Sequence, residues 1–178
     1  MADDPTALIE RSNDARRNGQ AAIALELAQK AVDIAQAGDD LDNLGAAVAT
    51  LARLRRDARQ YDIAVSLYEE AAAAARQRGD SLALAHRLRH IGDIVTEQGD
   101  LRRAEDAYAE VERLFGEAKA GELNTANFLR SKALLREKQG GRSAALQLWG
   151  EARALYAATS ITAGVAECDR RIAQLRAD

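Results

Sequence analysis

Apolar residues recur along this chain at the three- and four-residue spacing of amphipathic helices, and short polar breaks separate one such stretch from the next. Between residues 88 and 115, Leu88, Ile91 and Val95 lie on one helical stripe, and Tyr108 and Val111 lie on a second. A glycine and an aspartate at positions 99–100 interrupt the pattern between the two stripes. This stretch therefore predicts a hairpin of two helices.

The same hairpin pattern recurs at intervals of 40 or 41 residues. One position is alanine in every copy, and the position four residues later is alanine or aromatic. These pairs are Ala24 and Ala28, Ala64 and Tyr68, Ala104 and Tyr108, and Ala145 and Trp149. The polar break recurs at 18–19, 59–60, 99–100 and 140–141. Such a period is typical of a solenoid, in which each repeat buries its apolar face against its neighbours.

The repeated hairpin resembles the tetratricopeptide repeat (TPR). Residues 88–108 have bulky, small and aromatic residues at the spacing of that motif, namely Leu88, Ile91, Gly92, Val95, Ala104 and Tyr108. The familiar repeat has about 34 residues, so the units here are similar to the long-helix variety of kinesin light chain-like and bacterial regulatory proteins. The resemblance implies an all-α, right-handed superhelix (α-solenoid) of four helix-turn-helix hairpins plus a C-terminal capping helix. It also implies a scaffold that binds other proteins.

We expect one domain over residues 1–178. The hairpins are predicted at about 5–39, 41–78, 81–118 and 122–158, and the capping helix at about 160–176. The extra residue of the 41-residue step is expected in the linker 116–121. Ile23 and Ile63 are predicted to face inward on the second helices, and Ile161 is predicted to do so on the capping helix.

Composition narrows the classes of function. Hydrophobic residues make up 47% of the 178 residues but aromatics only 4%, and there is one proline, which favours helices packed through alanine and leucine. A net charge of −3 gives no sign of a nucleic-acid or membrane partner. The single cysteine excludes an internal disulfide, and the N-terminal residues do not resemble a signal peptide. We expect a cytoplasmic protein without cofactors.

Polar residues beside the inward stripes of the first helices would line the concave groove of such a superhelix. The register predicts a groove formed by Asn13, Arg17, Arg53, Arg56, His86, Arg89, His90, Asp93, Asn127 and Arg130. Five of these ten residues are arginines, whose guanidinium groups bind carboxylates through paired, charge-assisted hydrogen bonds. We therefore expect a protein or peptide partner with acidic groups. The alternative is a solvated face whose arginines pair with Glu10, Asp57 and Asp93.

Candidate chemistry elsewhere is weaker. His86, His90 and Asp93 share a helical face and could hold Zn²⁺, which leaves a metal-dependent enzyme as a less favoured alternative; no metal site is predicted. Cys168 lies on an apolar stripe, where a free cysteine packs as a small hydrophobe. Neither a glycine-rich phosphate loop nor a Ser-His-Asp pattern occurs in the sequence, so no catalytic activity is expected.

Three further interpretations concern partners. Asn13 matches one asparagine of the TPR carboxylate clamp for chaperone C-termini, but Ile9 and Thr50 replace the clamp's lysine and second asparagine. A chaperone co-factor role is therefore not expected. A sensor or regulatory subunit that responds to a peptide or small molecule and acts in trans stays open as the main alternative. A homodimer also stays open, because solenoid ends and alanine-rich walls offer surfaces for self-association.

Overall fold

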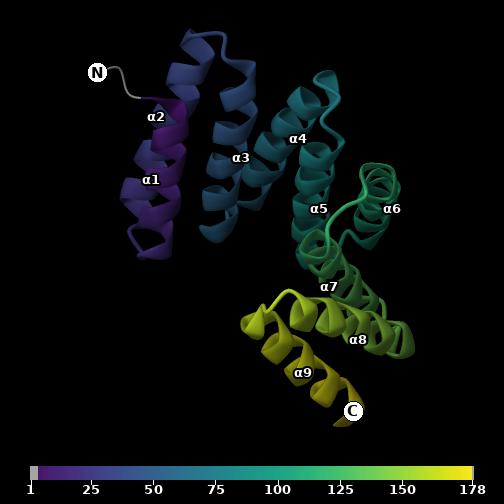
Figure 1. Ribbon diagram of the computed structural model, residues 1–178. Helices are drawn as coiled ribbons and strands as arrows, with labels where there is room; N and C mark the ends of the chain where they lie inside the picture. Colours follow the sequence, from purple (N-terminus) through teal and green to yellow (C-terminus); the bar gives the residue numbers. More distant parts are fainter. Residues whose placement is uncertain (1–3, 178) are drawn as a thin grey trace. The chain divides into compact units, whose positions relative to one another are not determined.

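The computed structural model describes residues 4–177 (at Asp42 the backbone alone), and every regular element in this range is helical. The elements are α1 (Pro5–Arg17), α2 (Ala21–Ala37), α3 (Leu41–Asp57), α4 (Tyr61–Gln77), α5 (Ser81–Gln98), α6 (Leu101–Ala118), α7 (Glu122–Lys138), α8 (Arg142–Ala158) and α9 (Thr162–Ala177) (Figure 1). Successive helices pair as hairpins, so the predicted all-α architecture is confirmed.

The helices group into two compact units, one ending at Ile94 and the other beginning at Val95. In the first unit α1 packs on α2, α2 on α3 and α3 on α4. In the second unit α6 packs on α7, α7 on α8 and α8 on α9. These helices thus pack on their neighbours in sequence, and α1 also contacts α3, as in a solenoid. The single domain expected over the whole chain stays a prediction.

One residue with left-handed backbone geometry lies in each turn between helices. These residues are Gly19, Asp39, Arg59, Gly79, Gly99, Lys119, Gly140 and Ser160, and they follow one another at 20-residue intervals with one exception of 21. Lys119 directly follows α6, and two residues rather than one then precede α7. The extra residue of the longer repeat therefore lies in 119–121, inside the predicted linker. The four predicted breaks are confirmed as turns.

Aspartate side chains begin four of the helices. Asp4, Asp40, Asp80 and Asp100 each accept a hydrogen bond from the backbone N–H three residues later, at 2.9–3.2 Å. These bonds satisfy N–H groups that have no partner within the helix. Pro5 follows Asp4 as the first helical residue, a position where the missing N–H of proline costs no helical hydrogen bond.

The helices of the first unit approach one another through alanine. Ala24, Ala28 and Ala31 on α2 are fully buried, and so is Ala64 on α4. The prediction that Ile23 and Ile63 face inward is wrong, because their exposed fractions are 48% and 49%. Each precedes a buried alanine, and the close contact made by that alanine leaves the preceding side chain outside.

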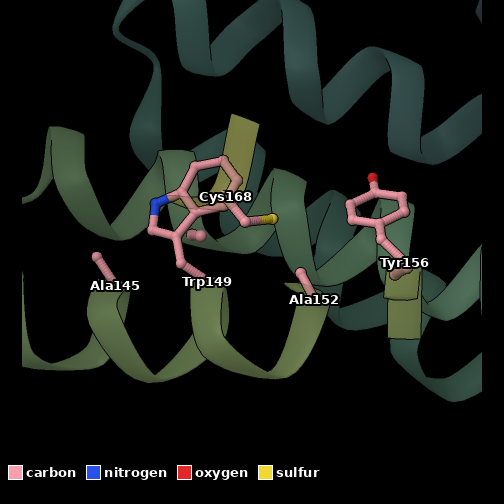
Figure 2. Packing of buried hydrophobic residues seen from close by; sticks show 7 residues of the cluster. Ala145, Trp149, Ala152, Tyr156 and Cys168 are labelled. Carbon is pink, nitrogen blue, oxygen red and sulfur yellow. The ribbon is translucent and has the colours of Figure 1, made fainter. Parts of the chain in front are cut away.

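The core of the second unit forms around Trp149 on α8 (Figure 2). Trp149 and Cys168 are fully buried, and the indole N–H of Trp149 donates to Glu137 Oε1 at 2.6 Å. α9 covers this core, as expected of the capping helix. Ile161 is a correction: it lies in the turn before α9 with an exposed fraction of 36%, because Ser160 is the left-handed residue and the helix begins only at Thr162.

Candidate binding site

The first helices of three hairpins exchange polar contacts in the first unit. Arg53 on α3 donates to Asn13 on α1, and Arg56 on α3 lies 3.2 Å from the Nδ1 atom of His90 on α5. Arg89 on α5 forms an ion pair with Asp93 at 2.9 Å. Six of the predicted groove residues are thus brought together. We call the surface that they form, Asn13, Arg53, Arg56, Arg89, His90 and Asp93, the arginine face.

The other two predicted residues of this unit lie beside the arginine face. Arg17 is exposed on α1 and forms an ion pair with Asp14. His86 is half-buried on α5, and burial lowers its pKa, as does the charge of Arg89. Within residues 4–177 the structure contains no group of three His, Cys, Asp or Glu side chains placed to hold a metal ion. His86, His90 and Asp93 are therefore not arranged as a metal centre.

Asn127 and Arg130 belong to the second unit and make contacts there. Arg130 on α7 donates from Nε and Nη2 to the two carboxylate oxygens of Glu167 on α9, both at 2.8 Å. This pairing lowers the pKa of Glu167. Asn127 accepts a hydrogen bond from the hydroxyl of Tyr156 on α8 at 2.9 Å. Arg130 thus links α7 to α9, and Asn127 links α7 to α8. A binding role for these two residues stays a prediction.

His90 lies at the centre of the arginine face. Its ring stacks on Tyr68 of α4 with centroids 5.0 Å apart. Burial lowers its pKa to about 4, although Asp93 acts in the opposite direction. The ring is therefore neutral at pH 7 and accepts a hydrogen bond at one nitrogen only. Arg56 and Arg89 each lie 3.2 Å from a different ring nitrogen, so His90 satisfies only one of the two guanidinium groups.

A pocket of about 180 Å³ opens beside His90. Side chains from α1, α3, α4 and α5 line it. We call it the Tyr68 pocket, and its lining residues are Ile9, Asn13, Ala46, Ala49, Thr50, Arg53, Tyr68, Arg87 and His90. Three predicted groove residues, Asn13, Arg53 and His90, therefore share a cavity.

Three lining residues have a buried polar atom without a protein partner among the described residues, and the Nε of Arg53 is one of these atoms. Tyr68 is 1% exposed, and its buried hydroxyl makes no hydrogen bond with any described residue. Burial raises the pKa of Tyr68 despite the surrounding charges of Arg56, Arg53, Arg87 and Arg89, so the phenol is protonated at pH 7. The buried Nε of Arg87 also has no partner in residues 4–177. Burial lowers the pKa of Arg87, but a guanidinium group stays charged.

The sequence analysis did not include Tyr68 or Arg87 among the binding residues. Tyr68 was expected only as a packing residue, and Arg87 lies between the predicted positions of its helix. The repeat contains a signal for Arg87, because the residue 40 positions earlier is the fully buried Ala47. A charged residue at a core position of a repeat indicates a local departure from simple packing.

Comparisons with solved structures identify the fold. The structure is similar to a putative kinesin light chain from Podosopora anserina with nearly identical TPR-like repeats (TM-score 0.71, 17% identity, 99% of this chain and 96% of that one). It is also similar to aspartyl phosphate phosphatase F from Bacillus subtilis (TM-score 0.69, 14% identity, 97% of this chain). This chain spans about half, 49%, of the phosphatase.

A third similar structure is BtubC (BKLC) from P. vanneervenii (TM-score 0.54, 19% identity, 97% of this chain and 88% of that one). No protein-family model matches the sequence, and a comparison with curated proteins gives no match. The structural neighbours are TPR-like repeat proteins over nearly the whole chain, so the predicted resemblance and fold are confirmed. In residues 4–177 no helix is both long enough and apolar enough to cross a membrane.

Proposed function

We propose that this chain is a protein–protein interaction module that binds a segment of a partner protein on the arginine face. A TPR-like fold is typically such a module. The observation that supports this face most directly is its excess of guanidinium groups over carboxylates. Arg53, Arg56 and Arg89 meet there, and Asp93 is the one acidic residue of the face.

An acidic segment is the partner chemistry that this face favours. The alternative of a solvated face explains part of the charge, because Asp57 forms ion pairs with Arg16 and Arg56, and Asp93 with Arg89. It does not explain Arg53, whose hydrogen bond goes to the neutral amide of Asn13. Since the face is built on helices, its side chains are ordered before binding, which lowers the entropic cost of association.

Catalysis is not part of the proposal. Cys168 is fully buried, and burial raises its pKa to about 11, so it is a protonated thiol inside the core at neutral pH. A chain with a single cysteine has no internal disulfide to maintain, and we expect the protein to work in the cytoplasm. A second candidate function is a regulatory subunit that responds to a small ligand, and the Tyr68 pocket is the observation that favours it.

Site-specific photo-crosslinking tests the proposed function. A photoreactive residue is placed at Arg17 or Arg56, beside or on the arginine face, and in matched control variants at Lys30 of α2 or Glu70 of α4, both exposed. Each variant is irradiated in lysate of the source organism, and the crosslinked proteins are identified by mass spectrometry. We expect one partner to be captured from Arg17 and Arg56 and not from the control positions.

Two other results are informative. Capture of the same partner from Lys30 and Glu70 alone would move the interface to the second helices and contradict the proposal. A crosslink between two copies of the chain from the arginine face would identify the partner as the chain itself. That result would support the interaction function with a homodimer as its product.

A further inference from the structure

Three of the residues that line the Tyr68 pocket, namely Arg53, Tyr68 and Arg87, have a buried polar atom without a protein partner in the described part of the chain. We propose that this pocket binds a carboxylate at the end of a short aliphatic chain. The pocket lies in the first unit, and residues from four helices line it. Its volume of about 180 Å³ is many times the roughly 10–15 Å³ that a cavity needs in order to hold one water molecule. A small acidic group together with part of its carbon chain therefore has room inside.

The polar residues that line the pocket offer hydrogen-bond donors and positive charge. Tyr68 presents a buried, protonated hydroxyl, and buried polar groups in native proteins nearly always have a partner. Arg87 and Arg53 line the same cavity, and neither forms an ion pair with any residue between 4 and 177. A phenol and two guanidinium groups together are suited to accommodate the two oxygens of a carboxylate.

His90 also lines the pocket, and it adds no charge there. Its ring is neutral at pH 7, and it stacks on Tyr68, which fixes the orientation of the phenol ring. Its two ring nitrogens lie 3.2 Å from Arg56 and Arg89, and the ring accepts a hydrogen bond from one of them. The cations that remain available to a ligand are therefore Arg53 and Arg87.

Acidic side chains of the protein itself are engaged elsewhere. Asp57 is held by Arg16 and Arg56, and Asp93 by Arg89. The charge of Asp80 acts to raise the pKa of Arg87. The Asp80 carboxylate itself caps α5 by accepting a hydrogen bond from the N–H of Ala83, and it forms an ion pair with Arg78. Asp57 and Asp80 act on Arg53 and Arg87 only through their charge, and an external carboxylate can form the ion pair that these arginines lack.

The apolar members of the lining distinguish a carboxylate on an aliphatic chain from an inorganic anion. They are Ile9, Ala46 and Ala49. A phosphate ion would place charged oxygens against these side chains and lose hydration there without a partner. An aliphatic chain instead gains contact with them while its carboxylate reaches Tyr68 and Arg87.

The carboxylate could belong to a glutamate of the partner segment or to a free organic acid. The first source rests on the proposed function, because it needs a peptide on the arginine face. The second requires only the pocket. The chemistry of recognition is the same in both cases, so the experiment uses probes for each source.

The test is a titration of the ¹⁵N-labelled full chain followed by amide chemical shifts. The probes are sodium butyrate, its uncharged analogue butyramide, inorganic phosphate, and N-acetylglutamate methylamide as a blocked glutamate residue. We expect saturable shifts around Tyr68 and Arg87 with butyrate, none with butyramide, and weaker binding of phosphate. Binding of the blocked glutamate at least as tight as that of butyrate would assign the pocket to a partner's side chain.

Three variants show whether the pocket is responsible. Arg87→Gln should weaken butyrate binding roughly tenfold or more, because a charge-assisted pair is replaced by a neutral contact. Tyr68→Phe should weaken it several-fold without lowering Tm, since the hydroxyl has no protein hydrogen bond to lose. Arg113→Gln is the matched control, since it removes an exposed, ion-paired arginine in the other unit, and it should bind as the wild type does.

Unchanged butyrate affinity in folded Arg87→Gln, or no saturable shift in the wild type, would overturn the inference. Phosphate binding tighter than butyrate would overturn the choice of a carboxylate. Failure of the proposed function has a different signature, because crosslinks from α2 and α4 alone leave the butyrate titration untouched. Conversely, crosslinks from the arginine face with no butyrate binding would keep the proposed function and remove the pocket.

Discussion

Single residues in the first unit show how burial sets charge. His90 is surrounded by Arg56 from α3, Tyr68 from α4, and Arg89 and Asp93 from its own helix. Burial is the largest influence and lowers its pKa to about 4, which leaves the ring neutral between two guanidinium groups. A proton on this ring would be repelled by both arginines and stabilised only by Asp93, at 3.8 Å.

The stability of the fold should therefore depend on pH through His90. An unfolded histidine binds its proton below about pH 6.5, whereas folded His90 does so only below about 4. Between these values the unfolded state holds the additional proton, so the free energy of unfolding falls as the pH falls. Between pH 7 and pH 5 we expect His90 to account for a loss of about 1–2 kcal/mol.

Denaturant unfolding of the wild type and His90→Gln at both pH values measures this contribution. The glutamine does not titrate, so the variant should lose less stability between pH 7 and pH 5 than the wild type. Changes in the exposed carboxylates are common to both proteins and cancel in the comparison. Equal losses in the two proteins would show that His90 has the same pKa in the folded and the unfolded state.

At this scale the sequence predicted part of the candidate site. Helical periodicity identified the directions of Asn13, Arg53 and His90, because a register specifies which way a side chain leaves its helix. It could not identify the pocket, because a pocket depends on how much room neighbouring helices leave. The small side chains of Ala46 and Ala49 line that space together with residues of three other helices, and no single helix indicates this by itself.

At the scale of helices, the contact between α8 and α9 depends on one glycine. A Cβ atom added at Gly164 would lie 2.6 Å from the ring of Tyr156. The ring cannot easily yield, because its hydroxyl donates to Asn127 on α7. The apolar stripe predicted for α9 includes Cys168, which is buried, but it omits Gly164, since a missing side chain leaves no hydrophobic signal.

Gly164→Ala should destabilise the protein by about 1–3 kcal/mol, the usual cost of overpacking. Gly150→Ala is the matched control on α8, where an added Cβ meets nothing within 4 Å. It should be neutral or stabilise by up to about 1 kcal/mol through helix propensity. Thermal unfolding of both variants checks the pair, and a stable Gly164→Ala protein would mean that α9 moves away from Tyr156 at little cost.

The bounds of the helices were the most predictable elements. Aspartate caps and polar breaks are local signals, and the structure follows them to within a residue or two. The outward direction of Ile23 and Ile63 was not predictable in the same way. Their apolar character suggests burial, but the contacts at Ala24 and Ala64 are so close that the adjacent isoleucines lie outside.

At the scale of the whole molecule, the repeat explains why the fold was predictable and the partner was not. The 40-residue period specifies which helix packs on which, and the TPR-like neighbours confirm that architecture. The polar residues between the packing positions differ from repeat to repeat, so they contain no period from which a function follows. A groove continuous through both units stays a prediction.

Packing between sequence neighbours also predicts that damage stays local. In a solenoid each repeat is stabilised by its own contacts and those of its neighbours. Gly164→Ala should therefore speed amide hydrogen exchange in α8 and α9 while exchange in α1–α3 stays unchanged. Exchange that rises equally along all nine described helices would instead indicate one cooperative unit.

The turns that contain the left-handed residues are suitable positions for new chain termini or for an inserted domain. They recur about every 20 residues, and at Gly19, Gly79, Gly99 and Gly140 an added Cβ would touch nothing within 4 Å. Opening the backbone there interrupts no helix and uncovers no packed surface, which is what a tolerated permutation or domain insertion needs. The turns thus mark natural positions for new termini or an embedded reporter, spaced one helix apart.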